Sequence, residues 1–100
     1  IRTIICGDEH LEKIVLVHGY GSSGCMFNGL MPQICERFCL ILVDLIGMGA
    51  SSRPKDYKHE TMSARESIDY FNDYFELWRQ KMIITNFYLA GHSFGGYVSA

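Results

Sequence analysis

The chain has 100 residues, of which 48% are hydrophobic and 20% charged, and its formal net charge at pH 7 is −2. This composition is typical of a folded domain with a real core and excludes a disordered segment. The lysines and arginines are scattered singly, so the charge pattern does not favour a nucleic-acid partner. The longest apolar runs, such as residues 38–43, are too short to span a bilayer.

Four short apolar segments are predicted to be strands. In chain order they are residues 3–6, 13–17, 38–43 and 87–90. Apart from Lys13, the segments at 13–17 and 38–43 are unbroken apolar runs, a pattern typical of strands buried on both faces of a sheet. We therefore expect a sheet covered by helices on both sides.

Two helices are predicted between these strands. Residues 25–37 are expected to be helical, with Pro32 marking a first turn. Residues 64–82 carry apolar side chains at spacings of three and four, and Ser63 with Glu66 has the form of a capping box. The alternation of strand and helix predicts right-handed parallel crossovers and an α/β fold with a mostly parallel sheet.

The cysteines and the chain ends set two further expectations. The cysteines are Cys6, Cys25, Cys35 and Cys39. They form no CxxC pair, which argues against structural zinc and favours free thiols in a reduced, intracellular setting. The sequence starts at Ile1 without a methionine and stops at Ala100 just after an expected helix start. We expect residues 1–100 to be part of a larger domain.

The loop after residues 13–17 has the sequence Gly19-Tyr20-Gly21-Ser22-Ser23-Gly24, a GxGxxG motif between a strand and an expected helix. Asp44 ends the next strand about 20 residues on, as a dinucleotide-binding fingerprint requires. In this interpretation the backbone approaches a pyrophosphate at the helix N-terminus, and Asp44 binds the ribose. A nucleotide-dependent oxidoreductase is therefore one candidate function.

A second motif, Gly91-His92-Ser93-Phe94-Gly95, follows the apolar segment 87–90 and precedes a helix-like segment at 97–100. GxSxG between a strand and a helix is typical of a nucleophile elbow. The turn strains the serine backbone, and a Cβ at either flanking glycine would clash with the neighbouring strand and helix. We therefore predict that Ser93 is a catalytic nucleophile.

With Ser93 as the nucleophile, the loop that follows residues 13–17 gains a second interpretation. Acyl transfer needs hydrogen-bond donors aimed at the oxygen of the tetrahedral intermediate. We predict that the backbone N–H groups of Tyr20 and Phe94 are these donors. His18 is interpreted as a structural side chain that braces the loop, because the base of such a triad lies late in the chain.

Three segments resemble the α/β-hydrolase superfamily in content and order. They are HGYGSSG at 18–24, DLIGMGAS at 44–51 and GHSFGG at 91–96, and the resemblance covers nearly the whole chain. Arg53-Pro54 and the long aromatic helix reaching Trp78-Arg79 are similar to the subfamily of lysophospholipases and their lipid-droplet and cardiolipin-deacylase relatives. The acyltransferase box of some relatives, His followed five residues later by Asp, does not occur here.

The resemblance implies a domain assignment and further roles. Residues 1–100 would be the N-terminal part of one α/β-hydrolase domain, truncated after the nucleophile elbow, with the triad His and acid beyond residue 100. Asp44 would organise the glycine loop that follows it, and Gly19 and Gly21 would support the motif that carries Tyr20. The substrate would be a lipid-like acyl ester, such as a lysophospholipid or N-acyl phospholipid, met by peripheral contact with a lipid surface and without a cofactor or metal.

The leading expectation is a serine ester hydrolase that forms an acyl-enzyme on Ser93. Two alternatives are a dinucleotide-binding oxidoreductase using Gly19–Gly24 and a non-catalytic interaction protein on a hydrolase scaffold. The first leaves the GxSxG motif unexplained, and the retained serine argues against the second. Residues 1–100 by themselves are expected to be inactive, because they lack a His that could deprotonate Ser93.

Overall fold

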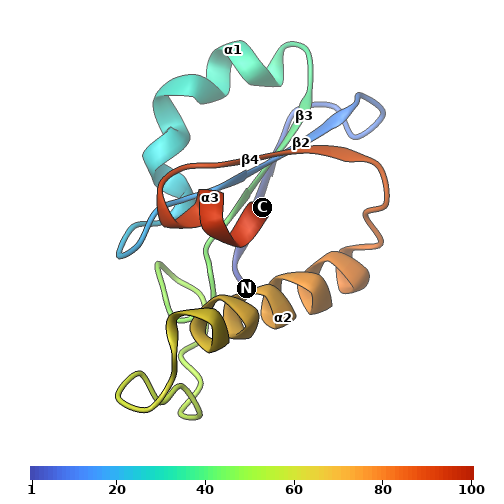
Figure 1. Cartoon of the computed structure of the whole chain (residues 1–100). Coiled ribbons are helices and arrows are strands. Elements are labelled where there is room, and N and C mark those ends of the chain that lie inside the picture. Colours follow the sequence, from blue (N-terminus) through green and yellow to red (C-terminus); the bar gives the residue numbers. More distant parts are fainter.

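The computed structural model describes all 100 residues, and a four-stranded sheet lies at its centre (Figure 1). The strands are β1 (Thr3–Cys6), β2 (Lys13–Val17), β3 (Cys39–Val43) and β4 (Phe87–Gly91). They lie in the order β1-β3-β2-β4, with β1 antiparallel to β3 and the other neighbours parallel. The predicted mostly parallel α/β sheet is confirmed.

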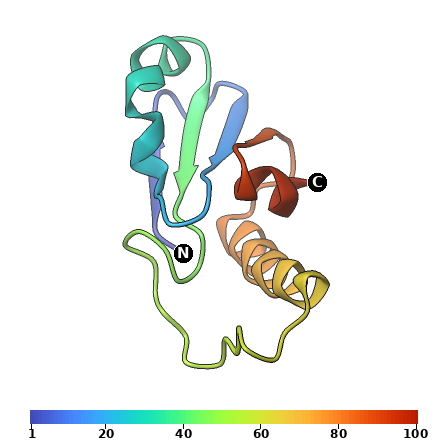
Figure 2. The ribbon, with the colours of Figure 1, turned by 60° about the vertical axis from the view of Figure 1, so that its left-hand side comes forward.

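Helices cover both faces of this sheet. A 3-10 helix, η1 (Gly24–Leu30), and the short α1 (Met31–Cys35) lie on one face. The long α2 (Ala64–Met82) and the short α3 (Phe94–Ser99) lie on the other, as Figures 1 and 2 show from two directions. The expectation of a sheet covered on both sides is therefore confirmed.

β2 and β3 are buried because their side chains alternate between two apolar layers. The larger layer lies between the sheet and α2 and includes Val15, Val17, Ile41, Val43, Phe71, Phe75 and Trp78. The smaller layer is formed by Leu16, Leu40 and Leu42, against apolar side chains of η1 and α1. This arrangement explains why both strands, apart from Lys13, are unbroken apolar runs.

The predicted helix at 64–82 and its capping box are both confirmed. The Ser63 hydroxyl accepts a hydrogen bond from the Glu66 N–H at 3.1 Å, and the Glu66 carboxylate accepts one from the Ser63 N–H at 2.6 Å. Hydrogen bonding of the Glu66 carboxylate to Ser63, chiefly to its backbone N–H, lowers the pKa of Glu66. The Trp78 indole N–H donates to the Thr3 hydroxyl at 2.8 Å, which fixes α2 to β1.

The single helix predicted for residues 25–37 is wrong in detail, because the segment is divided into η1 and α1. Pro32 is the second residue of α1, where a missing N–H is tolerated. Its ring would clash with the carbonyl four residues earlier in a continuous α-helix, so the α-helix begins only at Met31. Pro32 therefore does mark a first turn, but of a shorter helix.

β4 is an edge strand of the sheet and is far less covered than β2. Tyr88 and Leu89 are 57% and 38% exposed. The helix after β4 begins at Phe94, three residues before the expected start. All four cysteines are free. None of the helices combines the length and apolar character needed to cross a bilayer.

Candidate active site

Ser93 lies in a tight turn between β4 and α3. Its backbone angles, φ 54° and ψ −119°, and a 2.9 Å hydrogen bond from the Gly95 N–H to the His92 carbonyl define a type II′ turn. The His92 N–H donates to the Val17 carbonyl at 2.9 Å, which fixes the turn to the end of β2. A non-glycine residue at positive φ is strained, and such strain concentrates at functional sites.

The two glycines of this turn are required by close backbone approach. A Cβ at Gly95 would collide with the carbonyl oxygens of Val17 and His18, and one at Gly91 would collide with the backbone of Gly95. The turn can therefore press against β2 and α3 only with glycine at both positions. Ser93 itself is exposed.

The loop after β2 packs directly against the serine. A Cβ on Gly19 would lie 3.3 Å from the Ser93 Cβ, so the next residue, Tyr20, begins beside the elbow. The Tyr20 N–H donates to no acceptor within the chain, and the Phe94 N–H, in the first turn of α3, lacks an intrahelical acceptor. Gly21 has φ +68° with open space around it, so its need for glycine is conformational.

His18 is completely buried, and both of its ring nitrogens are engaged. Nε2 accepts a hydrogen bond from the Leu45 N–H at 2.9 Å, which leaves Nδ1 as the protonated nitrogen, 2.6 Å from the Gly19 carbonyl. The ring therefore bridges the loops after β2 and β3. With no free lone pair, His18 is not arranged to take a proton from Ser93.

Asp44, only 2% exposed, lies at the centre of a second hydrogen-bond network. Its carboxylate accepts the N–H groups of Gly24 at 2.7 Å and Ala50 at 2.9 Å, and Arg2 approaches to 3.3 Å. The Ser51 hydroxyl donates to the Asp44 backbone carbonyl at 2.6 Å. Burial alone would raise the pKa of Asp44, but the hydrogen bonds from Ala50 and Gly24 and the Arg2 charge together lower it.

These contacts do not fit the dinucleotide-binding interpretation. The Asp44 carboxylate already binds the Gly24 N–H inside the protein, so neither group is free for a ribose or a pyrophosphate. The strand order also differs. A doubly wound nucleotide-binding half adds each new strand outward, whereas β4 here pairs with β2, not with β3.

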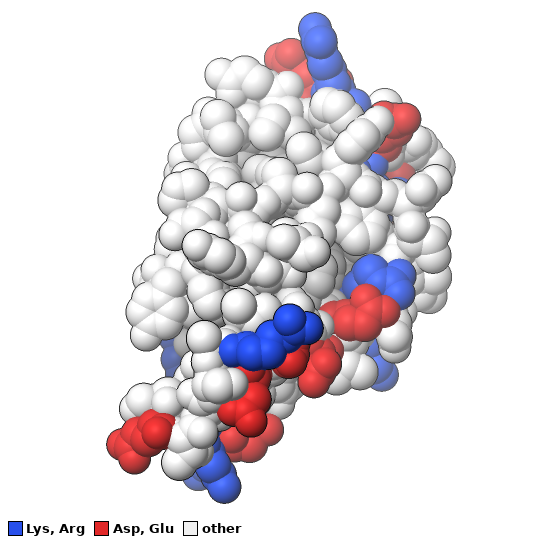
Figure 3. Space-filling model, viewed as in Figure 1, with Lys and Arg blue, Asp and Glu red and all other residues white.

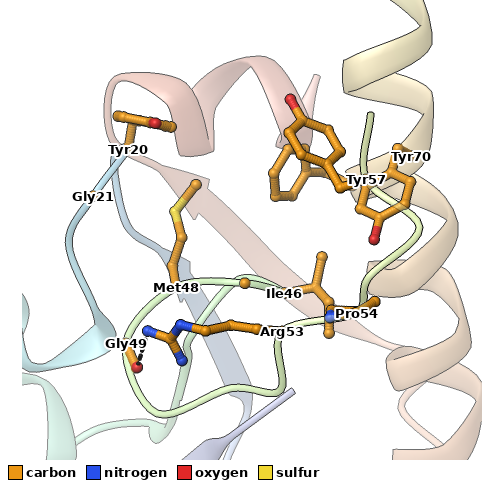
Figure 4. A pocket seen from close by; sticks show the side chains of 11 residues that line it. Tyr20, Gly21, Ile46, Met48, Gly49, Arg53, Pro54, Tyr57 and Tyr70 are labelled. Atoms are coloured by element: carbon orange, nitrogen blue, oxygen red, sulfur yellow. Dashed lines mark hydrogen bonds between the residues drawn. The ribbon is translucent and has the colours of Figure 1, made fainter. Parts of the chain in front are cut away.

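A cavity of about 440 Å³ opens next to the elbow (Figure 4). It is lined by residues of the loops after β2 and β3 and by α2, namely Tyr20, Gly21, Ile46, Gly47, Met48, Gly49, Arg53, Pro54, Tyr57, Tyr70 and Phe71. Phe94, next to Ser93, contacts both Tyr20 and Phe71 through edge-to-face rings, with centroids 6.3 and 5.1 Å apart. Two lining residues of the cavity thus contact the residue that follows Ser93.

Charged side chains are unevenly spread over this side of the molecule. Figure 3 shows them gathered at the lower end, over α2, and at the top, with a broad uncharged area between. The exposed large hydrophobic residues include Tyr20, Tyr88, Leu89 and Tyr97, which belong to the β2 loop, β4 and α3. The elements around the elbow are thus rich in exposed aromatic surface.

The structure also brings together residues whose role the sequence motifs did not indicate. Arg2 pairs with Asp44 across 42 positions of sequence, and no local pattern links the two. Arg53, noted in the sequence only as a subfamily feature, lines the cavity opposite Tyr57 and Tyr70 (Figure 4). Arginines and tyrosines occur throughout the sequence, so no local signal would have selected Arg2, Arg53, Tyr57 and Tyr70.

Comparison with known proteins places this arrangement in a family. Residues 13–100 match the model of the alpha/beta hydrolase fold family. The chain is 43% identical, over 93% of its length, to a probable 1-acylglycerol-3-phosphate O-acyltransferase of Oryza sativa subsp. japonica. It is 35% identical, over 99% of its length, to the (lyso)-N-acylphosphatidylethanolamine lipase of Homo sapiens. It spans 22% and 28% of the lengths of these two relatives.

A solved structure agrees with the family match. A hydrolase from Pseudomonas aeruginosa PA01 superposes with a TM-score of 0.79 and 20% sequence identity, covering 96% of this chain and 33% of that one. At this identity the superposition establishes the fold alone. Together, the matched sequence, the sheet order and the turn after β4 show that the chain belongs to the alpha/beta hydrolase fold family.

Proposed function

We propose that the protein that contains this chain is a serine hydrolase of lipid-like acyl esters, with Ser93 as its nucleophile. The observation that carries the proposal is the type II′ turn at Ser93, which presents an exposed hydroxyl beside the Tyr20 and Phe94 N–H groups and an adjoining cavity. Family membership and relatives that act on lipids support the same reaction class.

The reaction would proceed through an acyl-enzyme. The Ser93 Oγ attacks the ester carbonyl carbon, a histidine takes the hydroxyl proton, and the N–H groups of Tyr20 and Phe94 bind the resulting oxyanion. The same histidine then protonates the leaving alcohol, and water releases the acyl group as a carboxylic acid. His18 has both nitrogens occupied, so we assign the base, and the acid that orients it, to residues beyond position 100.

The substrate class follows from the lining of the cavity and from the relatives. Six of the eleven lining residues are hydrophobic, which suits an acyl chain or glyceride backbone. The names of the two relatives, an acylglycerol-phosphate acyltransferase and an N-acylphosphatidylethanolamine lipase, both refer to glycerolipids that carry phosphate. We therefore propose a glycerolipid ester as the substrate.

Covalent labelling of the complete protein tests the nucleophile. A fluorophosphonate probe should attach to Ser93, as identified by peptide mapping, and Ser93→Ala should abolish the labelling. Ser99→Ala, which removes a buried hydroxyl from α3, serves as the control and should label like the unchanged protein. Labelling at another residue, or labelling that persists in Ser93→Ala, would overturn the assignment. Absence of any labelling would favour a non-catalytic interaction protein.

Acyl transfer to an alcohol is a second candidate, favoured by the name of the rice relative. It would use the same acyl-enzyme, with an acceptor hydroxyl in place of water. Product analysis with a labelled acyl ester and added lysophospholipid separates the two. Free fatty acid as the main product supports hydrolysis, and a diacylated phospholipid supports transfer.

A further inference from the structure

Arg53 places a positive charge on the wall of the cavity beside the elbow. It is the one charged side chain among the eleven residues that line this cavity. Its guanidinium donates from Nη1 to the Ser51 carbonyl at 2.9 Å and from Nη2 to the Gly49 carbonyl at 3.0 Å, the second of which is drawn in Figure 4. These bonds to neutral carbonyls hold the planar group in place without cancelling its charge.

The acidic residues nearest to Arg53 in the sequence, on either side of it, form hydrogen bonds with other groups. Asp44 is paired with Arg2 and with two backbone N–H groups. Asp56 accepts a hydrogen bond from the Tyr70 hydroxyl at 2.9 Å. None of the four ion pairs in the structure includes Arg53. Its charge is therefore available to a ligand in the cavity.

A guanidinium carries five N–H donors, so the two bonds to carbonyls leave three for an anion. A planar set of donors matches the oxygens of a phosphate better than a point charge does. Tyr20 and Arg53 both line this cavity. Tyr20 follows Gly19, which packs against Ser93. A ligand that fills it can therefore place an ester near the serine and an anionic group at the arginine.

We propose that Arg53 binds the phosphate of a glycerolipid headgroup while the acyl ester of the same molecule reaches Ser93. This assignment rests on the proposed function and deepens it, because it makes Arg53 the residue that selects phosphorylated over uncharged glycerides. The contact with phosphate is the same before and during the attack on the ester. Its loss should therefore raise KM more than it lowers kcat.

The test compares two monomeric substrates with the same acyl chain, 1-octanoylglycerol 3-phosphate and 1-octanoylglycerol, on the complete protein. Arg53→Gln should lower kcat/KM for the phosphorylated ester about tenfold to a hundredfold, the range expected for losing a charged hydrogen bond. The decrease for the uncharged ester should be much smaller. Arg53→Lys should restore part of the preference, because it keeps the charge but loses the fork of donors.

Lys55→Gln is the matched control, since it removes a nearby positive charge that does not line the cavity. It should leave the preference for the phosphorylated ester intact. An equal loss for both substrates in Arg53→Gln would indicate a structural role and overturn the proposal. An equal loss of preference in Lys55→Gln would also overturn the proposal, because the preference would then depend on the total positive charge of this region and not on Arg53.

Binding to Ser93→Ala, measured by calorimetry with the same two lipids and with inorganic phosphate, separates this proposal from the proposed hydrolase function. Arg53-dependent preference for the phosphorylated lipid without turnover in the unchanged protein would support the phosphate site and reject the hydrolase. Turnover without such a preference would support the hydrolase and reject the phosphate site. Inorganic phosphate binding as tightly as the phosphorylated lipid would show a site for free phosphate, and the headgroup assignment would be wrong.

Discussion

Asp44 and Ser93 each follow a strand of the same mostly parallel sheet. The two sites differ in whether the nearby hydrogen-bonding groups already have partners within the protein. At Asp44 the carboxylate binds the N–H groups of Gly24 and Ala50, and the side chain is buried. At Ser93 the hydroxyl is exposed, and the nearby N–H groups of Tyr20 and Phe94 have no acceptor in the chain. The Asp44 carboxylate is thus bound within the protein, whereas the donors beside Ser93 remain available.

Polar side chains at strand ends therefore have two different roles in this molecule: Asp44 holds a loop in shape, and Ser93 is presented to a ligand. A closed network stabilises the loop geometry, because every buried polar group has a partner. An open arrangement has a strained residue at positive φ and N–H donors without acceptors. These donors become useful when a substrate supplies the missing acceptor. The comparison therefore predicts opposite consequences for substitutions in the two loops.

The largest expected effect is on turnover at the open loop. Ser93→Ala in the complete protein should lower kcat by about 10⁶, since the proposed mechanism forms the acyl-enzyme on Ser93 alone. The melting temperature should change little, because the turn's glycines and its bond to Val17 remain. A kcat within tenfold of the original would remove Ser93 from the mechanism.

The next effect concerns the backbone donor at Tyr20. Replacing the Tyr20 amide by an ester removes its N–H and should lower kcat by about 10² to 10³. Tyr20→Ala keeps the N–H and should lower kcat less than about tenfold, although the ring contact with Phe94 is lost. Similar losses in both proteins would show that the side chain, and not the amide, is what matters.

A third prediction concerns how the elbow is packed. Gly95→Ala should lower the free energy of unfolding by about 3 kcal/mol, because the added methyl collides with the Val17 and His18 carbonyl oxygens. Gly96→Ala is the matched control, since its methyl would meet the Gly91 carbonyl oxygen at 3.5 Å, an ordinary contact. Urea unfolding of the complete protein measures both. Equal effects at the two positions would contradict the packing described here.

The smallest expected effect is at the closed loop. Asp44→Asn should lower the free energy of unfolding by about 2 kcal/mol at pH 7, because an amide oxygen replaces only part of the carboxylate's acceptor capacity. Since the folded-state pKa of Asp44 is lowered, its stabilisation is present above about pH 4 and is lost as pH falls through that pKa.

Urea unfolding of both proteins between pH 7 and pH 3 checks this expectation. The difference in stability should stay constant above about pH 4 and shrink below it. The kcat of Asp44→Asn should stay close to that of the unchanged protein. A loss of about 10⁴ in kcat at full stability would instead make Asp44 the acid of the triad and reverse the comparison.

Local patterns in the sequence were enough to predict much of the fold. The apolar runs at 13–17 and 38–43, the periodicity of 64–82 and the Ser63–Glu66 capping box each depend on residues close together in the chain. The segment 25–37 was predicted less well, because Pro32 and Gly29 weaken the helical signal without fixing where the helix starts.

The glycine motifs do not by themselves determine the fold. The GxGxxG motif at 19–24 is compatible with both a dinucleotide-binding fold and a hydrolase fold. It is the GxSxG motif at 91–95 that favours the hydrolase. The choice between the two folds depends on which strand β4 joins and on what the Gly24 N–H binds. Both are contacts between segments that are distant in sequence.

The sequence by itself determined the strands, the long helix and its cap, and the candidate nucleophile, since these follow from spacings of a few residues. Only the tertiary structure decided the partners of His18 and Asp44, the pairing of β4 with β2, and the position of Arg53 on the cavity. The physical reason is that burial and hydrogen bonding are satisfied by whichever groups packing brings together, and loop closure brings together groups that no local spacing relates.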